Sequence, residues 1–140
     1  MKKVKVSESE GQVLNYLVAR CLGGSVRLHT YRGEPADQVL VIDWMYDWQE
    51  LSEFSPSTDW AQGGPIIERE KLGVWWATHY VDDEGVEYGN HWYAEPGCTD
   101  DNADKPYRVA TGPTPLIAAM RCYVVNKLGD EVEVPDEMAS

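Results

Sequence analysis

Apolar residues recur at helical spacing near the start of the chain, which predicts an amphipathic helix. They form one broad face made of Val13, Leu14, Leu17, Val18, Cys21 and Leu22. The preceding Ser-Glu-Ser-Glu string has the order of a capping box, with Ser7 as the N-cap and Glu10 as the third helical residue. Gly23 and Gly24 predict the end of this helix, because glycine adopts the left-handed cap conformation without strain.

A second helix is predicted near the C-terminus. Thr114 suits its N-cap and Pro115 its first position, where a missing N–H costs nothing. Its apolar stripe consists of Leu116, Ile117, Met120, Val124 and Leu128. The opposite side carries the small residues Ala118, Ala119 and Cys122, so we expect neighbours to cover this helix on most sides before Gly129 ends it.

Two runs between the helices alternate or are continuously apolar in the manner of strands. Residues 26–31 alternate, and residues 39–42 read Val-Leu-Val-Ile, which is typical of a buried strand. The turn-forming residues from Gly33 to Asp37 separate them, so the two runs are predicted to pair as a hairpin.

A second hairpin is predicted from residues 74–81 and 86–94, which are rich in aromatic residues and flank a tight loop from Asp82 to Gly85. The polar residues 95–106 are predicted to form a loop and residues 107–110 one more short strand.

These elements together predict a single α+β domain over residues 1–129. It has an antiparallel sheet of about four to five strands, flanked by an N-terminal and a C-terminal helix. A chain of 140 residues is long enough for one hydrophobic core. The acidic residues 130–140 are predicted to fray as a C-terminal tail.

The charge is strongly negative and unevenly spread. Twenty-four acidic residues face twelve basic ones, for a net charge of −12. No Lys or Arg occurs between Arg32 and Arg69, or between Lys71 and Lys105. Direct nucleic-acid binding is therefore disfavoured, because its affinity comes from basic residues that displace counterions. The acids either keep the protein soluble or imitate a phosphate backbone and occupy a nucleic-acid-binding host protein.

The sequence predicts a cytoplasmic, reduced protein without a membrane segment. No apolar run is long enough to span a bilayer, and residues 1–5 lack the apolar stretch of a signal peptide. Cys21, Cys98 and Cys122 are isolated and odd in number, which favours neither a disulfide framework nor a zinc site.

The segment from Ser55 to Arg69 combines turn-forming residues with Trp60 and a Gly-Gly-Pro string, and we predict a loop that packs on itself or on a neighbour. Glycines permit close approach to a ligand, the start of the C-terminal helix offers free N–H groups, and tryptophan offers a stacking face. A small anionic, nucleotide-like ligand would suit this set. The candidate residues are Asp59, Trp60, Gln62, Gly63, Gly64, Arg69, Thr114 and Arg121.

This hypothesis requires the Ser55–Arg69 segment to pack against the start of the C-terminal helix, with Trp60 beside Thr114. The alternative is purely structural: the glycines shape a turn, Trp60 fills the core, and Arg69 pairs with Asp59 or Glu68.

No catalytic motif accompanies these residues, and no cofactor is predicted. His79 and His91 lie on strands predicted to pair, yet a metal site needs three or four ligands, so we predict no metal. Ser57 and Cys98 have no base that the sequence reveals.

The adjacent Trp75 and Trp76 point to opposite faces of a strand. Either both faces are covered or one tryptophan is exposed, which favours a binding surface or a homo-oligomer.

Four strings resemble the NinX-like family of small phage and prophage proteins. They are Gly11 with Leu14, Ser55 to Arg69, Gly112 to Arg121, and Lys127 to Val132. The resemblance covers roughly half of the chain. Asn15-Tyr16 departs from it, because related chains often carry an acid followed by tryptophan there. The resemblance implies a phage accessory protein in the bacterial cytoplasm and implies no particular reaction.

Two functions remain open. The favoured one is a non-enzymatic binding protein that engages a host protein or sequesters a small anionic ligand. The other is a small hydrolase or transferase acting on a nucleotide-like substrate, which needs a cleft where Asp59, Glu68, Arg69 or His79 converge.

Overall fold

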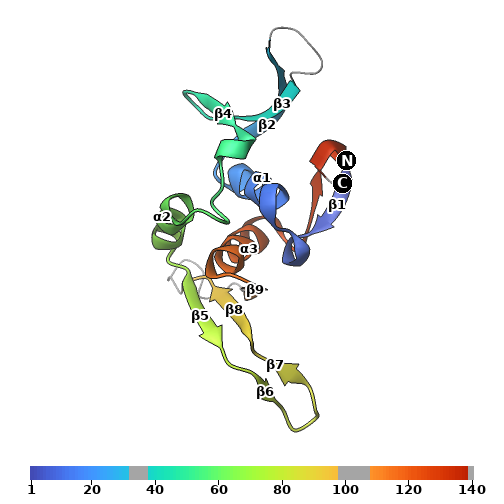
Figure 1. Cartoon of the computed structure of the whole chain (residues 1–140), viewed down its shortest axis with the longest axis vertical. Coiled ribbons are helices and arrows are strands. Elements are labelled where there is room, and N and C mark those ends of the chain that lie inside the picture. Colours follow the sequence, from blue (N-terminus) through green and yellow to red (C-terminus); the bar gives the residue numbers. More distant parts are fainter. Residues whose placement is uncertain (32–37, 98–107, 139–140) are drawn as a thin grey trace.

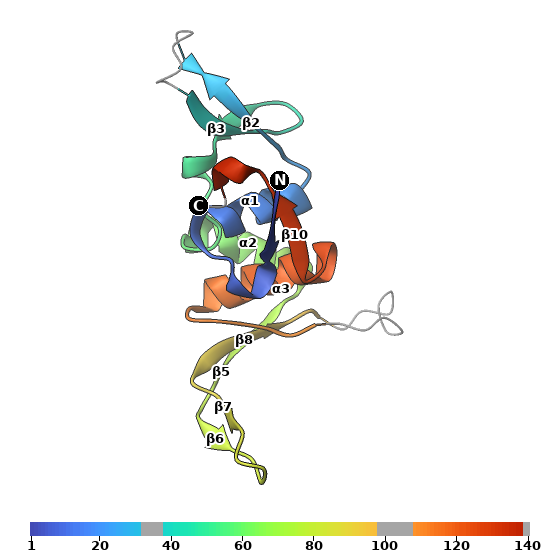
Figure 2. The same cartoon turned by 90° about the vertical axis from the view of Figure 1, so that its right-hand side faces the viewer.

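Three helices form the centre of the molecule, and β-hairpins extend from it in opposite directions (Figures 1 and 2). The computed structural model describes residues 1–31, 38–97 and 108–138. The helices are α1 (Gly11–Cys21), α2 (Trp60–Glu70) and α3 (Pro115–Leu128). The chain is an α+β protein, as predicted, with α1 and α3 in the predicted regions.

Helix α3 is the most deeply buried element. Every residue from Leu116 to Val124 is buried, so the expectation of a widely covered helix is confirmed. Thr114 Oγ1 accepts a hydrogen bond from the Ile117 N–H at 3.1 Å, as expected of an N-cap. Gly129, with φ of 97°, ends the helix where predicted.

Helix α1 packs its predicted apolar face into the core but does not begin with the predicted capping box. Its N-cap is Glu10, which makes no capping bond with its side chain, and Ser7 lies in a short 3-10 helix, η1 (Val6–Glu8). The reason is tertiary. Val6 is fully buried and its N–H donates to the Asp130 carbonyl, so the chain must turn before α1 can start.

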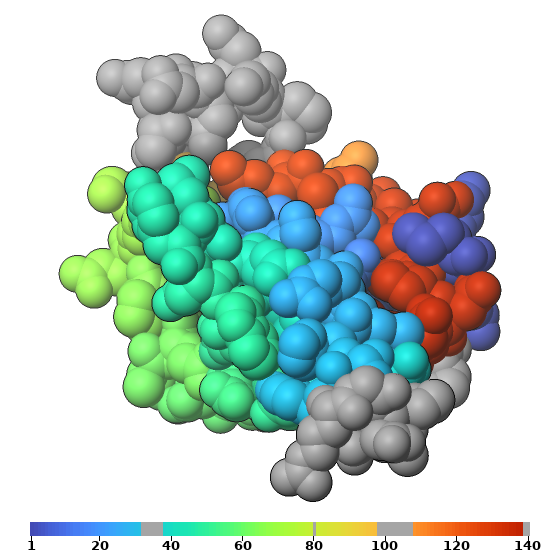
Figure 3. Space-filling model, turned by 90° about the horizontal axis from the view of Figure 1, so that it is seen from above, coloured from blue at the N-terminus to red at the C-terminus, as the bar shows by residue number. Residues whose placement is uncertain are grey.

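The two ends of the chain pair with each other. Strand β1 (Lys2–Lys5) runs antiparallel to β10 (Glu131–Val134), and Figure 3 shows the N-terminal and C-terminal segments side by side. Val132, Val134 and Met138 are buried, the last in the short 3-10 helix η6 (Asp136–Met138). The prediction of a frayed tail is therefore wrong for residues 131–138, because their alternating valines complete the core beside α1 and α3.

The first predicted hairpin is confirmed. Strand β2 (Ser25–Thr30) pairs antiparallel with β3 (Gln38–Asp43), and β3 pairs with β4 (Trp48–Glu50). A short 3-10 helix, η4 (Leu51–Glu53), follows β4. The predicted turn over residues 33–37 lies outside the described residues.

The second predicted hairpin is also confirmed and forms two consecutive ladders. Strand β5 (Gly73–Ala77) pairs with β8 (His91–Glu95), and beyond them β6 (Tyr80–Val81) pairs with β7 (Glu87–Tyr88). We call residues 73–95 the arm, because they extend away from the helices in both views (Figures 1 and 2).

The last short strand lies later than predicted. Strand β9 (Ala110–Gly112) pairs with β8, whereas the prediction began at residue 107. Residues 98–107, which include most of the predicted 95–106 loop, lie outside the described part of the chain.

The strands do not form one sheet. In the described residues they divide into two three-stranded and two two-stranded sheets, because α1 and α3 lie between the β2–β3–β4 sheet and the β5–β8–β9 sheet (Figure 1). The prediction of a single sheet of four to five strands is thus corrected to several small antiparallel sheets.

The Ser55–Arg69 segment is largely helix and not loop. Asp59 caps α2, with its Oδ1 atom accepting from the Ala61 N–H at 3.0 Å, and Lys71 ends the helix in the left-handed conformation. Gly63, Gly64 and Pro65 are poor helix residues, so packing overrides their intrinsic preference here.

Candidate functional site

The two segments predicted to pack together do so. They line a hollow of about 200 Å³ formed by Ser57, Thr58, Trp60, Thr114, Pro115, Leu116 and Ile117. Trp60 therefore lies beside Thr114, at the point where α2 and α3 both begin. Its side chain is 56% exposed, so Trp60 is not a core residue.

Two of the predicted ligand-binding residues are already engaged within the protein. Asp59 Oδ2 accepts from Gln62 Nε2 at 3.0 Å. Gln62 Nε2 also donates to the Glu53 carbonyl at 3.2 Å, and Gln62 Oε1 accepts from the Ser55 N–H at 2.9 Å. This pair fastens the segment before α2 to the first turn of that helix.

The two glycines of α2 have different surroundings. A Cβ atom on Gly63 would overlap the Pro56 carbonyl oxygen and lie 2.6 Å from Leu116 Cδ2. A Cβ atom on Gly64 would meet nothing within 4 Å. Gly63 thus permits close approach of protein to protein, where the sequence hypothesis expected close approach of a ligand.

The two predicted arginines do not reach the Trp60 hollow. Arg69 lies near the end of α2, with its Nε atom 3.6 Å from Glu70 Oε2. Arg121 is one turn further along α3 and lines a different pocket. The structure therefore brings Trp60 and Thr114 together, and none of the described residues that line their hollow is charged.

Arg121 is an unusual buried cation. Only 8% of it is exposed, and it donates from Nε to the Ser9 carbonyl at 2.8 Å and from Nη1 to the Thr111 carbonyl at 2.9 Å. Burial lowers the pKa of its guanidinium, and the charge of Glu10 partly offsets that effect.

The pocket that Arg121 lines holds about 250 Å³ and lies between β1, β9 and α3. Its charged lining residues are Lys5, Arg108, Arg121, Asp130 and Glu131, and its apolar ones are Val6, Val109, Ala110 and Val125.

The arm carries aromatic side chains on both faces. Trp76 and Trp92 pair across the strands on the face toward α3, with ring centroids 5.5 Å apart, and Trp76 is 48% exposed. On the opposite face Trp75 stacks on Tyr93 with centroids 5.7 Å apart and planes 15° apart. Trp75 is 39% exposed, so of the two alternatives for the adjacent Trp75 and Trp76, covered faces or exposure, the structure shows exposure, and shows it for both.

His91 continues the outer aromatic group, with its ring centroid 6.3 Å from that of Tyr93. We call Trp75, Tyr93 and His91 the aromatic row. It faces away from α3, because on the alternate positions Ala94 belongs to the core and Val74 and Trp92 pack against it.

The tip of the arm is acidic and is held by Asp82. Its Oδ1 atom accepts from the N–H groups of Glu84 and Val86, each at 2.9 Å. Gly85, with φ of 85°, completes the turn.

These bonds make the tip sensitive to acid. The Val86 N–H is the largest cause of a pKa of Asp82 below its ordinary value of 3.8. A depressed folded pKa means that the carboxylate's stabilisation is fully present above the ordinary value and is lost as the pH falls through the folded one. We expect the Glu84 and Val86 amide NMR signals to shift together below pH 3.8. Asp82→Asn keeps an acceptor oxygen but does not titrate, so the same shift in that variant would contradict this origin.

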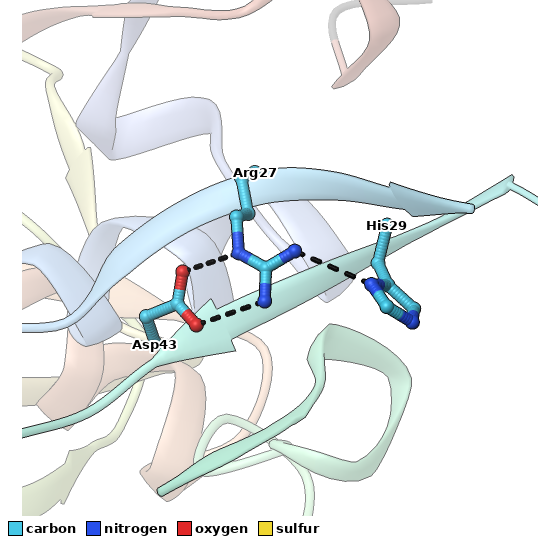
Figure 4. A network of polar contacts seen from close by, with 3 residues as sticks. All are labelled: Arg27, His29 and Asp43. Carbon is cyan, nitrogen blue, oxygen red and sulfur yellow. Dashed lines mark hydrogen bonds and ion pairs between the residues drawn. The ribbon is translucent and has the colours of Figure 1, made fainter. Parts of the chain in front are cut away.

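A second exposed aromatic group lies on the β2–β3–β4 sheet. Figure 4 shows Arg27 bonded through Nε and Nη2 to the two carboxylate oxygens of Asp43, at 2.6 and 3.2 Å, with Nη1 3.3 Å from His29 Nδ1. The His29 ring contacts those of Tyr31 and Trp48, with centroids 4.6 and 5.1 Å apart. The bidentate pair neutralises both charges and fixes β2 on β3.

The residues weighed for catalysis are dispersed or engaged. Ser57 Oγ donates to Asn15 Oδ1 at 2.7 Å, and burial raises the pKa of Cys21 to about 11 and that of Cys122 to about 12. Cys98 lies outside the described residues. His79 Nε2 is 3.9 Å from Glu87 Oε2 on the arm.

Across the described ranges no three His, Cys, Asp or Glu side chains lie where they could hold a metal ion. None of the helices in the described part of the chain has both the length and the apolar character for a bilayer crossing.

Sequence reasoning missed the surroundings of Arg121. Its position inside the run of apolar and small residues from Leu116 to Val124 was the available signal, because a cation in the covered middle of a helix is buried with its neighbours. The sequence also placed Arg121 with Trp60 and Thr114, although the seven residues from Thr114 to Arg121 span about 10 Å along the helix axis.

Comparison with known proteins gives a family. No curated protein matches the chain significantly. A family model described as bacteriophage P22 NinX matches residues 5–127, which include the Ser55–Arg69 and Gly112–Arg121 strings. The chain therefore belongs to the NinX family of phage proteins.

Proposed function

We propose that this protein is a non-enzymatic binding protein that engages a protein of the bacterial host through its arm, in the cytoplasm of that host. The observation that carries the proposal is the aromatic row of Trp75, Tyr93 and His91 on a hairpin that extends from the helical centre. Exposed Trp and Tyr side chains are enriched among residues that dominate binding energy.

The charge of the arm favours a basic partner surface. From residue 72 to residue 104 the sequence contains no Lys or Arg, while Asp83, Glu84 and Glu87 are exposed at the tip. Opposite charges at an interface raise the association rate and exclude other partners. A second copy of this chain would bring the same acidic tip, so a different protein suits the arm better than a homo-oligomer.

The enzymatic alternative has less support. Asp59 precedes α2 and Arg69 lies ten residues later, which separates them by about 15 Å along the helix axis. His79 is on the arm beside Glu87. A hydrolase or transferase site built from these residues would require them to converge.

The proposal is tested by affinity purification of the tagged protein from host cells, with matched variants. We expect a captured partner to bind at least about tenfold more weakly to Trp75→Ser, because a buried tryptophan anchor contributes about 2 kcal/mol or more. Asp83→Lys with Glu84→Lys should weaken binding further at low salt. Tyr46→Ser removes a 93% exposed ring elsewhere and serves as the control.

The outcome decides between the alternatives. The proposal is supported by a partner that binds the wild type and Tyr46→Ser with equal affinity but does not bind Trp75→Ser. Equal capture by all variants, or capture of no protein, contradicts it. If DNA or RNA displaces the protein from its partner, the acidic residues imitate a nucleic-acid backbone. If the purified chain forms a dimer and Trp75→Ser does not, the partner of the arm is a second copy of this chain.

A further inference from the structure

We infer that the pocket between β1, β9 and α3 binds a small organic anion, with Arg121 as its anchor. None of the described residues that line this pocket belongs to the arm, although β9 pairs with the arm strand β8, and the inference is independent of the proposed function. Arg121 is a buried cation in a protein of net charge −12, yet no carboxylate in the described part of the chain lies within ion-pair distance of it.

The other cations of the pocket differ from Arg121 in this respect. Arg108 Nη1 is 2.9 Å from Asp130 Oδ1, and Lys5 lies directly opposite Glu131 in the β1–β10 ladder. Among the lining residues that the structure describes, three cations and two carboxylates leave one net positive charge. That charge belongs to the most buried of the three cations.

The protein's own acceptors leave part of the guanidinium free. Nε and Nη1 donate to the Ser9 and Thr111 carbonyls, while Nη2 has no hydrogen-bond partner within the described residues. A carbonyl oxygen carries only a partial charge, whereas a carboxylate or phosphate oxygen forms a charge-assisted bond of roughly twice the strength. Restricted solvent access strengthens that bond further.

The remaining lining defines the body of the ligand. Val6, Val109, Ala110 and Val125 supply apolar walls, and Ser7 and Thr111 supply hydroxyl groups. The volume of about 250 Å³ lies just below the usual range for ligand pockets. The fitting class is a carboxylate or phosphate monoester on a compact apolar body.

The test is an NMR titration of the full chain with benzoate, phenyl phosphate, inorganic phosphate and the neutral benzyl alcohol. We expect saturable shifts of the Ser7 and Thr111 amide signals with benzoate or phenyl phosphate, at a dissociation constant on the order of 1 mM. Benzoate and phenyl phosphate distinguish carboxylate from phosphate recognition. Inorganic phosphate alone should bind more weakly, since it lacks the apolar body.

Charge variants keep the test independent of folding. Arg121→Met should abolish the shifts, but it also removes the bonds to Ser9 and Thr111. Asp130→Asn is the sharper variant, because it removes one carboxylate from the rim and frees Arg108, and we expect about fivefold tighter binding. Arg108→Met should weaken binding about fivefold, since it leaves Asp130 unpaired. Lys127→Met, at an exposed cation of α3 outside the pocket, should leave binding unchanged.

Either of two results would overturn the inference. One is the absence of saturable shifts at Ser7 and Thr111 with any anion up to about 20 mM. The other is that benzyl alcohol binds as tightly as the anions, or that neither Asp130→Asn nor Arg108→Met changes the affinity for the anions. Trp75→Ser should leave the titration unaltered, which separates this pocket from the function proposed for the arm.

Discussion

Replacing Gly63 with alanine is expected to lower the free energy of unfolding by about 2 kcal/mol, although alanine is the better helix former. The new methyl group would overlap the Pro56 carbonyl oxygen and crowd Leu116 Cδ2 at 2.6 Å. The Pro56 carbonyl is backbone and cannot rotate away as the Leu116 side chain can, so α2 must shift from the segment that precedes it. The cost of that shift exceeds the gain in helix propensity of about 1 kcal/mol.

Gly64→Ala is the matched control for this prediction. It makes the same chemical change one residue later in the same helix, where nothing lies within 4 Å, and should raise the free energy of unfolding by up to about 1 kcal/mol. Urea unfolding of both variants measures the difference of about 3 kcal/mol. Two variants of equal stability would show that α2 does not approach Pro56 and Leu116 as closely as described.

Asn15→Ala is expected to lower the free energy of unfolding by about 3 kcal/mol, because it leaves two buried donors without an acceptor. Asn15 Oδ1 accepts from the Ser57 N–H at 3.1 Å and from Ser57 Oγ at 2.7 Å. Both residues are buried, so water cannot replace the lost acceptor. These bonds hold the segment before α2 against α1.

Ser57→Ala separates the two bonds. It removes the hydroxyl donor and keeps the N–H bond to Asn15, so we expect a cost of only about 1 kcal/mol. Gln12→Ala, at an exposed position of α1, controls for the general effect of alanine in this helix. Chemical denaturation of the three variants gives the comparison, and an Asn15→Ala cost no greater than that of Ser57→Ala would contradict the geometry.

Elements with a local code were predictable. The cap at Thr114, the proline at Pro115 and the stop at Gly129 fixed α3 to the residue, because capping depends on neighbours three positions away. Both hairpins followed from alternation and turn residues. The predicted cap at Ser7 was wrong because a capping box is only a local pattern, and burial of Val6 overrides it.

The prediction for the glycines of α2 was wrong because a local turn signal was followed where packing selects a helix. A Gly-Gly-Pro string indicates a turn on local grounds, yet packing of Gly63 on Pro56 and Leu116 selects a helix. The candidate site failed for a related reason. Trp60 and Thr114 lie together because α2 and α3 begin at the same place. Arg121 lies further along α3 and therefore away from that place.

The sequence by itself therefore determined the α+β class, the helix over residues 115–128, both hairpins and the family membership implied by its strings. Tertiary structure alone decided that residues 131–134 form a strand, that the sheets are separated by α1 and α3, and that Arg121 is buried beside Lys5 and Arg108. The physical reason is the range of the forces involved. Caps, turns and periodicity act within a few residues, while burial and close approach depend on segments more than a hundred residues apart, such as Ser9 and Arg121.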